Sequence, residues 1–228
     1  LINDPIHPNT SQPTPQDFAN VYRELSQQTD GIISIHISSK LSGTCNSALQ
    51  AKELVATNCP VEVVDSKTVS MGLGLLAIAI ANSVNSGKGL QQVVEEAKQL
   101  ISNTHVWALF DTLKYLALGG RIGKAKALLG SVLNIKPVLV VKDGEMAPAS
   151  QVRTRAKGIG VLCNFVNKII DIQDLAIVHS TTPNEAQVLA DHIGAIFDKD
   201  QIRLARMGPT LGVHAGPGAL IVALRGKG

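Results

Sequence analysis

The sequence predicts an α/β protein in two parts: a first part on a parallel sheet and a second, α+β part on a mixed sheet. Over the first half of the 228 residues, short apolar strands alternate with helical patterns, as in parallel sheets whose strands are joined by helices. In the second half, an Asp143-Gly144 turn between strand patterns indicates an antiparallel hairpin. We place the boundary after residue 117, which gives domains 1–117 and 118–228.

The first half opens with a helix that has a clear start signal. Thr14 can cap it, Pro15 suits the first helical position, and Asp17 places an acid in the first turn. Alternating apolar and polar residues then predict a strand over 31–38, and a short strand follows over 61–65. The further elements that we expect are helices over 46–56, 72–84, 90–102 and 113–118, and a strand over 105–110.

The second half begins with an apolar strand from Pro137 that turns through Asp143-Gly144 into its neighbour. Helical and strand patterns then mix without repeats or a long linker, which favours the α+β architecture. The elements that we expect there are helices over 153–170 and 184–197, and strands over 175–179, 202–206 and 219–224.

The composition argues against two classes of partner. The net charge is only +3, the 21 basic residues are scattered, and aromatic residues make up 3% of the chain. A nucleic-acid groove needs clustered cations and stacking aromatics, so we expect no nucleic-acid partner. No apolar run reaches the ~18 residues of a membrane span, so we expect no stable membrane insertion.

The cysteines point to a reducing compartment. Cys45, Cys59 and Cys163 are odd in number and have no CxxC spacing, which argues against a disulfide framework and against a zinc site. No signal peptide is visible in the sequence. We therefore expect a cytoplasmic location and no metal.

Two glycine patterns resemble nucleotide-binding motifs but lack the required context. Residues 72–77 match GxGxxA, yet the preceding strand ends near Asp65, so close helix packing is the better interpretation. Residues 120–125 lack the first glycine of a phosphate loop and have Ala125 where a hydroxyl would bind magnesium. With no catalytic motif elsewhere, we expect no cofactor and no catalytic residue.

Two hydroxyl-rich segments are candidates for an anion site. Residues 9–13 precede the first helix, and residues 38–44 lie between a strand and a helix. Such turns expose backbone N–H groups and the positive end of the helix dipole to an anion. Simple capping by Ser42 or Thr44 explains the second segment equally well.

Two glycine-rich segments add a cation and an imidazole. In residues 119–123 the guanidinium of Arg121 can pair with a carboxylate, although a helix C-cap with an exposed arginine is the alternative. In residues 212–218 His214 is surrounded by glycine and proline, which favours a loop of defined shape that carries a functional imidazole. The alternative is a simple connection between strands in which the histidine is a cap.

These segments resemble the DegV family, and the resemblance runs over essentially the whole chain. A TSQPS-like segment is matched at Thr10–Thr14 and an SxxLSGT-like segment at Ser39–Thr44. The further matches are a valine-rich strand ending in Asp-Ser at 63–66, TLxYLxxGGRI at 112–122, LNIKP at 133–137 and GPxxGxHxGPGA at 208–219. Family members begin with a further strand before the TSQPS-like segment, so we expect the first strand to be missing here.

The resemblance implies a two-domain α/β protein that is not an enzyme and holds a long-chain fatty acid in an apolar tunnel. It implies a fatty-acid kinase subunit as partner, to which the carboxylate is presented for phosphorylation. Carried over residue by residue, the residues expected to bind the carboxylate are Thr10, Ser42, Arg121 and His214, with Ser11, Gly43 and Thr44 in support.

We expect Thr10 and Ser42 to donate hydrogen bonds to the carboxylate, Arg121 to supply charge and His214 to hold the other oxygen. One alternative is an enzyme or substrate-binding domain for a small carbonyl compound, related to the substrate domain of dihydroxyacetone kinases, with His214 holding the substrate. A structural domain with a fortuitous cavity is the third possibility. A long apolar pocket favours the lipid, and a small polar pocket favours the carbonyl compound.

Overall fold

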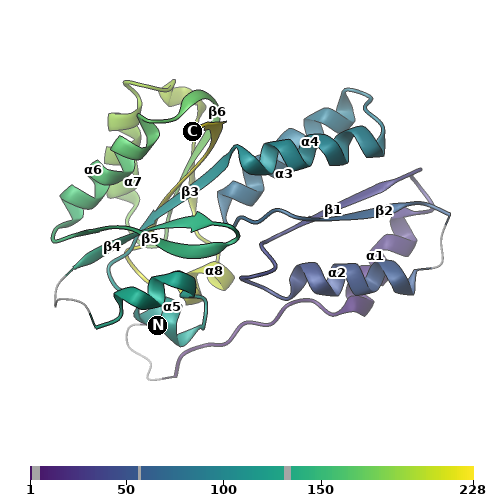
Figure 1. The fold of residues 1–228 in the computed structure, drawn as a ribbon, viewed down its shortest axis with the longest axis horizontal. Helices are drawn as coiled ribbons and strands as arrows, with labels where there is room; N and C mark the ends of the chain where they lie inside the picture. The colour runs from purple at the N-terminus through teal and green to yellow at the C-terminus, as the bar shows by residue number, and fades with distance from the viewer. Residues whose placement is uncertain (2–5, 56–57, 131–134) are drawn as a thin grey trace.

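The computed structural model describes residues 1, 6–55, 58–130 and 135–228, and it contains two sheets that lie side by side (Figure 1). The smaller sheet pairs two parallel strands, β1 (Ile32–His36) and β2 (Val61–Asp65). The larger sheet has six strands in the order β5-β4-β3-β8-β6-β7, with parallel and antiparallel pairs. The predicted fold class is confirmed: a parallel α/β unit and a unit with a mixed sheet.

Helices cover both faces of the smaller sheet. One face packs against α1 (Pro15–Leu25) and α2 (Thr44–Leu54) around the buried Tyr22. The other face packs against the neighbouring helices α3 (Met71–Asn85) and α4 (Leu90–Ser102), which extend along the sheet in Figure 1. A short two-stranded sheet is buried by this arrangement, because its Val and Ile side chains find apolar partners on both sides.

The start of α1 is as predicted. Thr14 and Asp17 form a capping box in which the Asp17 backbone N–H donates to Thr14 Oγ1 at 3.2 Å and the Thr14 N–H donates to Asp17 Oδ2 at 2.8 Å. Pro15 occupies the first helical position, where a missing N–H costs nothing. This start directs the preceding residues 6–13 across to the larger sheet.

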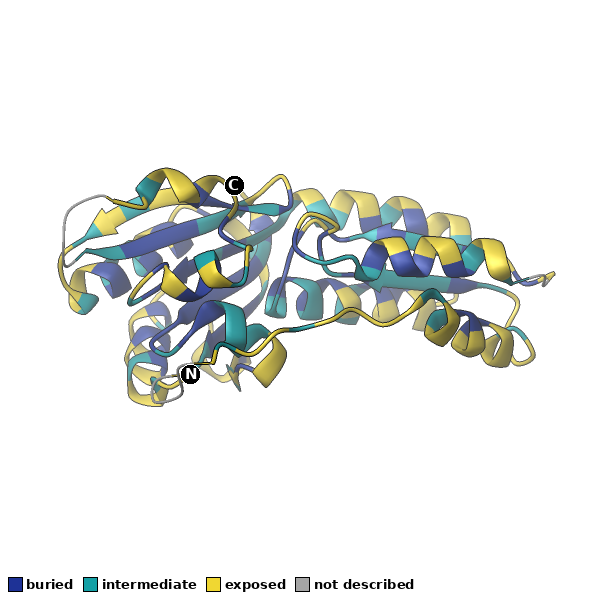
Figure 2. Cartoon of the chain, turned by 90° about the horizontal axis from the view of Figure 1, so that it is seen from below, coloured by how far each residue is buried: buried dark blue, intermediate teal, exposed yellow. Residues whose placement is uncertain are grey.

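The larger sheet lies between two apolar layers. Helices α6 (Arg155–Val166) and α7 (Pro183–Ile193) cover its outer face, and Figure 2 shows its strands mostly buried while the outward faces of the helices are exposed. The strands are β3 (Thr104–Leu109), β4 (Lys136–Lys142), β5 (Glu145–Val152), β6 (Ile170–His179), β7 (Ile202–Arg206) and β8 (Leu220–Lys227). The inner face is turned toward the smaller unit and the short elements α5 (Lys114–Leu118), α8 (Pro209–Ala215) and the 3-10 helix at Gly123–Leu128. A second 3-10 turn spans Lys199–Gln201.

Strand β3 differs from the prediction. The alternation of strands and helices predicts it in the parallel sheet, but it pairs antiparallel with β4 and β8 in the larger sheet. Its two faces explain this place: Val106 and Ala108 belong to the inner core, and Leu109 belongs to the core under α6 and α7. A strand that is apolar on both faces suits the middle of a covered sheet. The domain boundary after residue 117 stays a prediction, and β3 pairs with strands beyond it.

The predicted hairpin is present. Strands β4 and β5 pair from Lys142 opposite Glu145, and the turn residues Asp143 and Gly144 have φ of 52° and 83°. Positive φ at both central residues is the requirement of a type I′ turn, which Asp-Gly meets. The LNIKP segment at 133–137 runs into the start of β4, and its Leu133 and Asn134 lie outside the described residues.

The two late helices are shorter than predicted. Helix α6 ends at Val166, not near residue 170, because Ile170 already pairs with Lys227 of β8. Helix α7 ends at Ile193 with Gly194 as its C-cap.

Over the described residues, no helix combines the length and apolar character needed to cross a membrane, and no group of three or more His, Cys, Asp or Glu side chains could hold a metal ion. All three cysteines are free.

Candidate functional site

A cavity of about 520 Å³ lies between the two sheets. The residues that follow β1 and β2 form one side of it, among them Ser42 and Ser70, while β3 and β8 form the opposite side through residues such as Val106 and Ile221. The cavity is therefore at the carboxyl ends of the two parallel strands. Open α/β sheets bind their ligands at this edge.

Most of the cavity wall is apolar. The side chains come from both units and belong largely to the buried core between them. They are Ile37, Leu41, Val69, Val106, Ala108, Phe110, Leu116, Met146, Leu211, Ala215 and Ile221. Such a wall offers an alkyl chain a place away from water, but offers a sugar-like molecule few hydrogen-bond partners.

The polar lining contains the residues that the sequence analysis selected. Four segments far apart in the chain contribute Thr10, Ser42, Arg121 and His214 to the same cavity. Ser11 and Thr44 line it as well. Gly43 lies between two lining residues, and a Cβ there would meet the side chain of Gln12 at 2.9 Å. The geometry thus brings the predicted residues together, and their role in binding a ligand stays a prediction.

His214 is held against Thr10. The distance from His214 Nε2 to Thr10 Oγ1 is 2.8 Å, while Nδ1 is buried and has no hydrogen-bond partner among the described residues. Burial lowers the pKa of His214 below its ordinary value of 6.5, and the nearby positive charge of Arg121 and His7 lowers it further. A lowered pKa favours the neutral form of the ring. The tautomer of the ring sets which of Nε2 and the threonine hydroxyl is the donor.

The segment around His214 is a helix and not the loop that the sequence predicts. Helix α8 runs from Pro209 to Ala215 and places His214 in its last turn. Proline suits the first turn, and Gly216 with φ of +74° ends the helix in a conformation that other residues rarely adopt. The glycine and proline content thus marked the two ends of a short helix.

Arg121 connects the two sides of the cavity. Its Nη1 donates to the carbonyl of Gly119 at 2.7 Å, at the end of α5, and its Nε donates to the carbonyl of Leu41 at 3.0 Å, after β1. The side chain is half-buried and lines the cavity. The arginine closes the end of α5 and adds positive charge to the cavity, while its pairing with a carboxylate stays a prediction.

The hydroxyls at the start of α2 pair with each other. Ser42 Oγ and Thr44 Oγ1 are 2.8 Å apart, and the Thr44 backbone N–H donates weakly to Ser42 Oγ at 3.3 Å. The N-cap residue is Gly43, which makes no side-chain hydrogen bond, so Ser42 is not a simple helix cap. One hydroxyl hydrogen of this pair remains available to an anion in the cavity.

Sequence reasoning missed three polar lining residues, Gln12, Ser70 and Thr210. Gln12 is inside the recognised TSQPS-like segment, so proximity to Thr10 was the available signal. Ser70 has φ of 57°, which is rare for a residue with a side chain, and no sequence pattern identifies it. Thr210 is in helix α8, and only the folding of the segment after Gly208 as a helix places it on the cavity lining.

Comparison with known proteins agrees with this architecture. The model of the family described as “Uncharacterised protein, DegV family” matches residues 1–227. The chain belongs to the DegV family. A DegV domain-containing protein of Streptomyces coelicolor is 35% identical over 222 residues, covering 96% of this chain and 78% of the relative. One from Deinococcus radiodurans is 37% identical over 227 residues, covering 95% and 78%.

Solved DegV structures share the fold and are described as fatty-acid-binding proteins. The Thermus thermophilus protein, described under “Fatty Acid Binding of a DegV family Protein”, has a TM-score of 0.87 and 32% identity, covering 96% of this chain and 79% of that one. DegV of Bacillus subtilis, “a fatty acid binding protein”, has a TM-score of 0.83 and 29% identity, with coverage of 96% and 79%. The DegV resemblance and the two-part fold predicted from the sequence are thereby confirmed.

Proposed function

We propose that this DegV chain binds one long-chain fatty acid in the cavity between its sheets. The observation that carries the proposal is the composition of the cavity: Thr10, Ser42, Arg121 and His214 line it together with a wall that is otherwise mainly apolar. The description of the Thermus and Bacillus relatives as fatty-acid-binding proteins supports it. Ser11, Gly43 and Thr44 assist at the polar lining.

The apolar wall suits the alkyl chain in chemistry and in size. Burial of an alkyl chain gains about 0.8 kcal/mol per methylene, so a long chain offers on the order of 10 kcal/mol before the cost of association. At about 30 Å³ for each water-sized group, a triose would fill only about a third of the 520 Å³. This comparison favours the lipid over the small carbonyl compound.

The carboxylate needs compensation, because an unpaired buried charge is costly. In the tautomer that carries its proton on Nε2, His214 donates to Thr10 Oγ1, and the Thr10 hydroxyl hydrogen is then free to be donated to a carboxylate oxygen. Ser42 donates to the same carboxylate and Arg121 supplies the balancing charge. In that tautomer His214 orients Thr10; its expected contact with the other carboxylate oxygen stays a prediction.

The proposal extends to a partner, a separate fatty-acid kinase subunit that phosphorylates the presented carboxylate. Its support is the family resemblance, together with a polar lining made of hydrogen-bond donors. The residues placed around the carboxylate bind and orient it, and the transfer of the phosphoryl group belongs to the partner.

Native mass spectrometry of the purified chain, combined with lipid extraction, tests the binding proposal. We expect either a co-purified fatty acid or uptake of palmitate at one molecule per chain after delipidation. A clean mass without ligand, and no uptake on titration, would contradict the proposal. Dihydroxyacetone serves as the matched small carbonyl probe, and its retention in place of palmitate would favour the alternative.

The kinase step needs its own experiment. Palmitate-loaded chain, a purified fatty-acid kinase subunit and ATP are combined, and acyl-phosphate is trapped with hydroxylamine. We expect hydroxamate only when all three are present. Normal palmitate binding without hydroxamate would contradict the partner and leave the binding proposal standing.

A further inference from the structure

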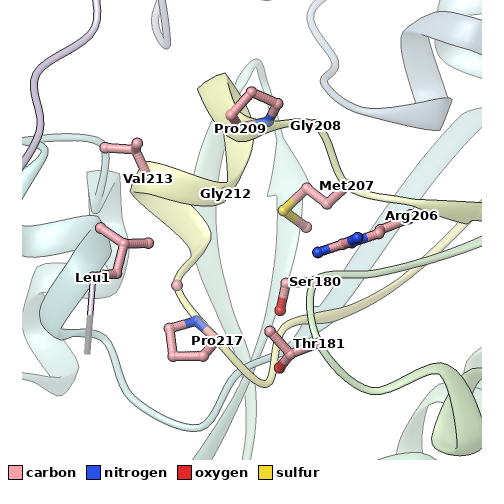
Figure 3. Close-up of a pocket in the computed structure, with 11 residues that line it drawn as sticks. Leu1, Ser180, Thr181, Arg206, Met207, Gly208, Pro209, Gly212, Val213 and Pro217 are labelled. Atoms are coloured by element: carbon pink, nitrogen blue, oxygen red, sulfur yellow. The ribbon is translucent and has the colours of Figure 1, made fainter. Parts of the chain in front are cut away.

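A second cavity, of about 570 Å³, lies on the other side of helix α8 (Figure 3). The helix separates the two spaces: Leu211 and His214 face the fatty-acid cavity, while Gly212 and Val213 face the second one. No described residue lines both cavities. The second cavity is thus a separate space, next to the carboxyl ends of the parallel strands β6 and β7.

The polar groups of this cavity are hydrogen-bond donors. Arg206, at the end of β7, has no recorded side-chain hydrogen bond or ion pair with the described residues. Thr181 Oγ1 accepts the Gly218 N–H at 3.0 Å, which leaves its hydroxyl hydrogen to donate. Ser180 Oγ accepts the Ala219 N–H at 3.0 Å, and the Ser180 hydroxyl donates only weakly within the described part of the chain, to the Ala219 carbonyl at 3.5 Å. A rim of this kind favours an anion.

The opposite wall is apolar. Figure 3 shows Pro209, Val213 and Pro217 across the space from Ser180, Thr181 and Arg206, with the Met207 side chain between. A small inorganic anion would leave this wall exposed to water. A molecule that has an apolar body and one anionic end would cover the wall and pair with the guanidinium, as ligand pockets of this size commonly do.

Two of the glycines on the lining are Gly208, the N-cap residue of α8, and Gly212. A Cβ at Gly208 or Gly212 would meet nothing within 4 Å, and neither residue has positive φ. Gly212 is inside α8, where alanine would favour the helix. At Gly212, where neither packing nor φ requires glycine, the absent methyl group leaves room in the cavity. Gly216 differs, because a Cβ there would lie 2.1 Å from the Tyr115 ring.

We infer that this cavity is a second binding site, for a small amphipathic anion whose carboxylate or phosphate pairs with Arg206 and Thr181 and whose apolar body lies against Val213 and Pro209. The site is independent of the fatty-acid cavity, because the two share no lining residue. Arg206 is the specificity residue, since its guanidinium is the only charged side chain on the lining among the described residues; Leu1 also lines the cavity.

Native mass spectrometry of the full chain, first loaded with palmitate, tests this site. Octanoate and hexyl phosphate are the two anionic probes, and octanol and inorganic phosphate are the controls that lack one half of the ligand. We expect a second adduct with at least one anionic probe, and the stronger of the two identifies the head group. Equal binding of octanol, binding of inorganic phosphate alone, or no second adduct would overturn the inference.

Variants connect the adduct to this cavity. We expect Arg206→Gln to weaken the second adduct by about tenfold or more, because it removes a charged hydrogen-bond partner. Arg203→Gln on the same exposed strand is the matched control and should leave it unchanged. Gly212→Ala should weaken the adduct while the melting temperature is kept or raised. Equal effects of the two arginine variants, or an unaffected adduct in Gly212→Ala, would place the ligand elsewhere. Palmitate occupancy in the same spectra reports the first site separately.

Discussion

His214 depends on a neighbour that has no side chain. Gly119, at the end of α5, lies so close that a Cβ there would be 2.1 Å from His214 Nδ1. The imidazole is thus fixed from one side by the glycine and from the other by its hydrogen bond to Thr10.

Gly119→Ala should displace the His214 ring and weaken fatty-acid binding. The Thr10–His214 hydrogen bond cannot keep its geometry with a methyl group against Nδ1, so we expect about a tenfold loss of affinity and a lower melting temperature. Palmitate titration and thermal unfolding measure the two effects. Gly160→Ala, where a Cβ meets open space within α6, is the matched control. Unchanged affinity in Gly119→Ala would refute the role of His214.

Ser42→Ala and Thr10→Ala should each weaken palmitate binding by roughly ten- to a hundredfold, because each removes a hydrogen bond to a charged group. Isothermal titration with delipidated protein measures the change. Ser39→Ala is the matched control: it also removes a hydroxyl from the segment after β1, but Ser39 is exposed, donates to Asp65 and does not line the cavity. If all three variants bound palmitate equally, the polar lining would not be the carboxylate site.

Acid should destabilise the protein through two histidines. Burial lowers the pKa of His36, partly offset by Asp65, and burial together with Arg121 lowers that of His214. Each histidine has a folded-state pKa below its unfolded value of 6.5, so the unfolded chain binds more protons than the folded chain as the pH falls below 6.5. The contribution of the two neutral histidines to the free energy of unfolding is therefore present above pH 6.5 and is lost toward acid.

Urea unfolding at a series of pH values from 7.5 to about 5 checks this sign. The free energy of unfolding should decrease toward acid, and His214→Gln should flatten the dependence. His192→Gln, which changes an exposed histidine, should follow the parent chain. A steeper slope for His214→Gln would mean that protonation of His214 favours the folded state.

The β4–β5 hairpin joins the two units at the level of elements. Its turn meets the connection after β1, where the fully buried Ser38 hydroxyl donates to the Gly144 carbonyl at 2.6 Å. Glu145 beside the turn pairs with Lys40 at 3.5 Å and Lys124 at 3.0 Å. These ion pairs are exposed and contribute little, so the buried hydrogen bond is the main polar contact of the tip.

Ser38→Ala should therefore lower the free energy of unfolding by about 1–3 kcal/mol, since it leaves a buried carbonyl without its donor. Glu145→Gln should change it by less than about 1 kcal/mol. Urea denaturation of both variants measures the difference. A loss in Glu145→Gln as large as that in Ser38→Ala would show that the ion pairs hold the hairpin.

At the scale of the whole molecule, the fatty-acid cavity lies between the two units, so ligand binding and the free energy of unfolding are linked. A ligand that binds only the folded chain raises the free energy of unfolding, by about 2.7 kcal/mol at a free concentration one hundred times its Kd. The apolar core between the sheets, which includes Leu41, Val106 and Phe110, forms part of the cavity wall and connects both units through it.

Delipidated protein should melt at a lower temperature than palmitate-loaded protein, and palmitate should restore the difference. Differential scanning calorimetry at fixed protein concentration measures it, with dihydroxyacetone as the matched small probe. Stabilisation by dihydroxyacetone but not by palmitate would contradict the lipid proposal at the level of the whole fold.

The sequence alone determined those features whose causes are local. Thr14, Pro15 and Asp17 start a helix, and Asp143-Gly144 makes a hairpin turn, because neighbouring residues supply the hydrogen bonds and the positive φ that these structures need. The site residues were accessible for another reason: they lie in segments that resemble the DegV family. The resemblance of these segments to the DegV family identified the residues, but it did not give their arrangement in space.

Only the tertiary structure decided which distant groups meet. Strand β3 is in the mixed sheet because both of its faces find a core there, and alternation of strands and helices carries no information about strand partners. Thr10 and His214 are 204 positions apart and become neighbours only when α8 packs beside the segment before α1. The second cavity has the same origin, because it lies between the ends of β6 and β7 and the far side of a helix that the sequence presented as a loop.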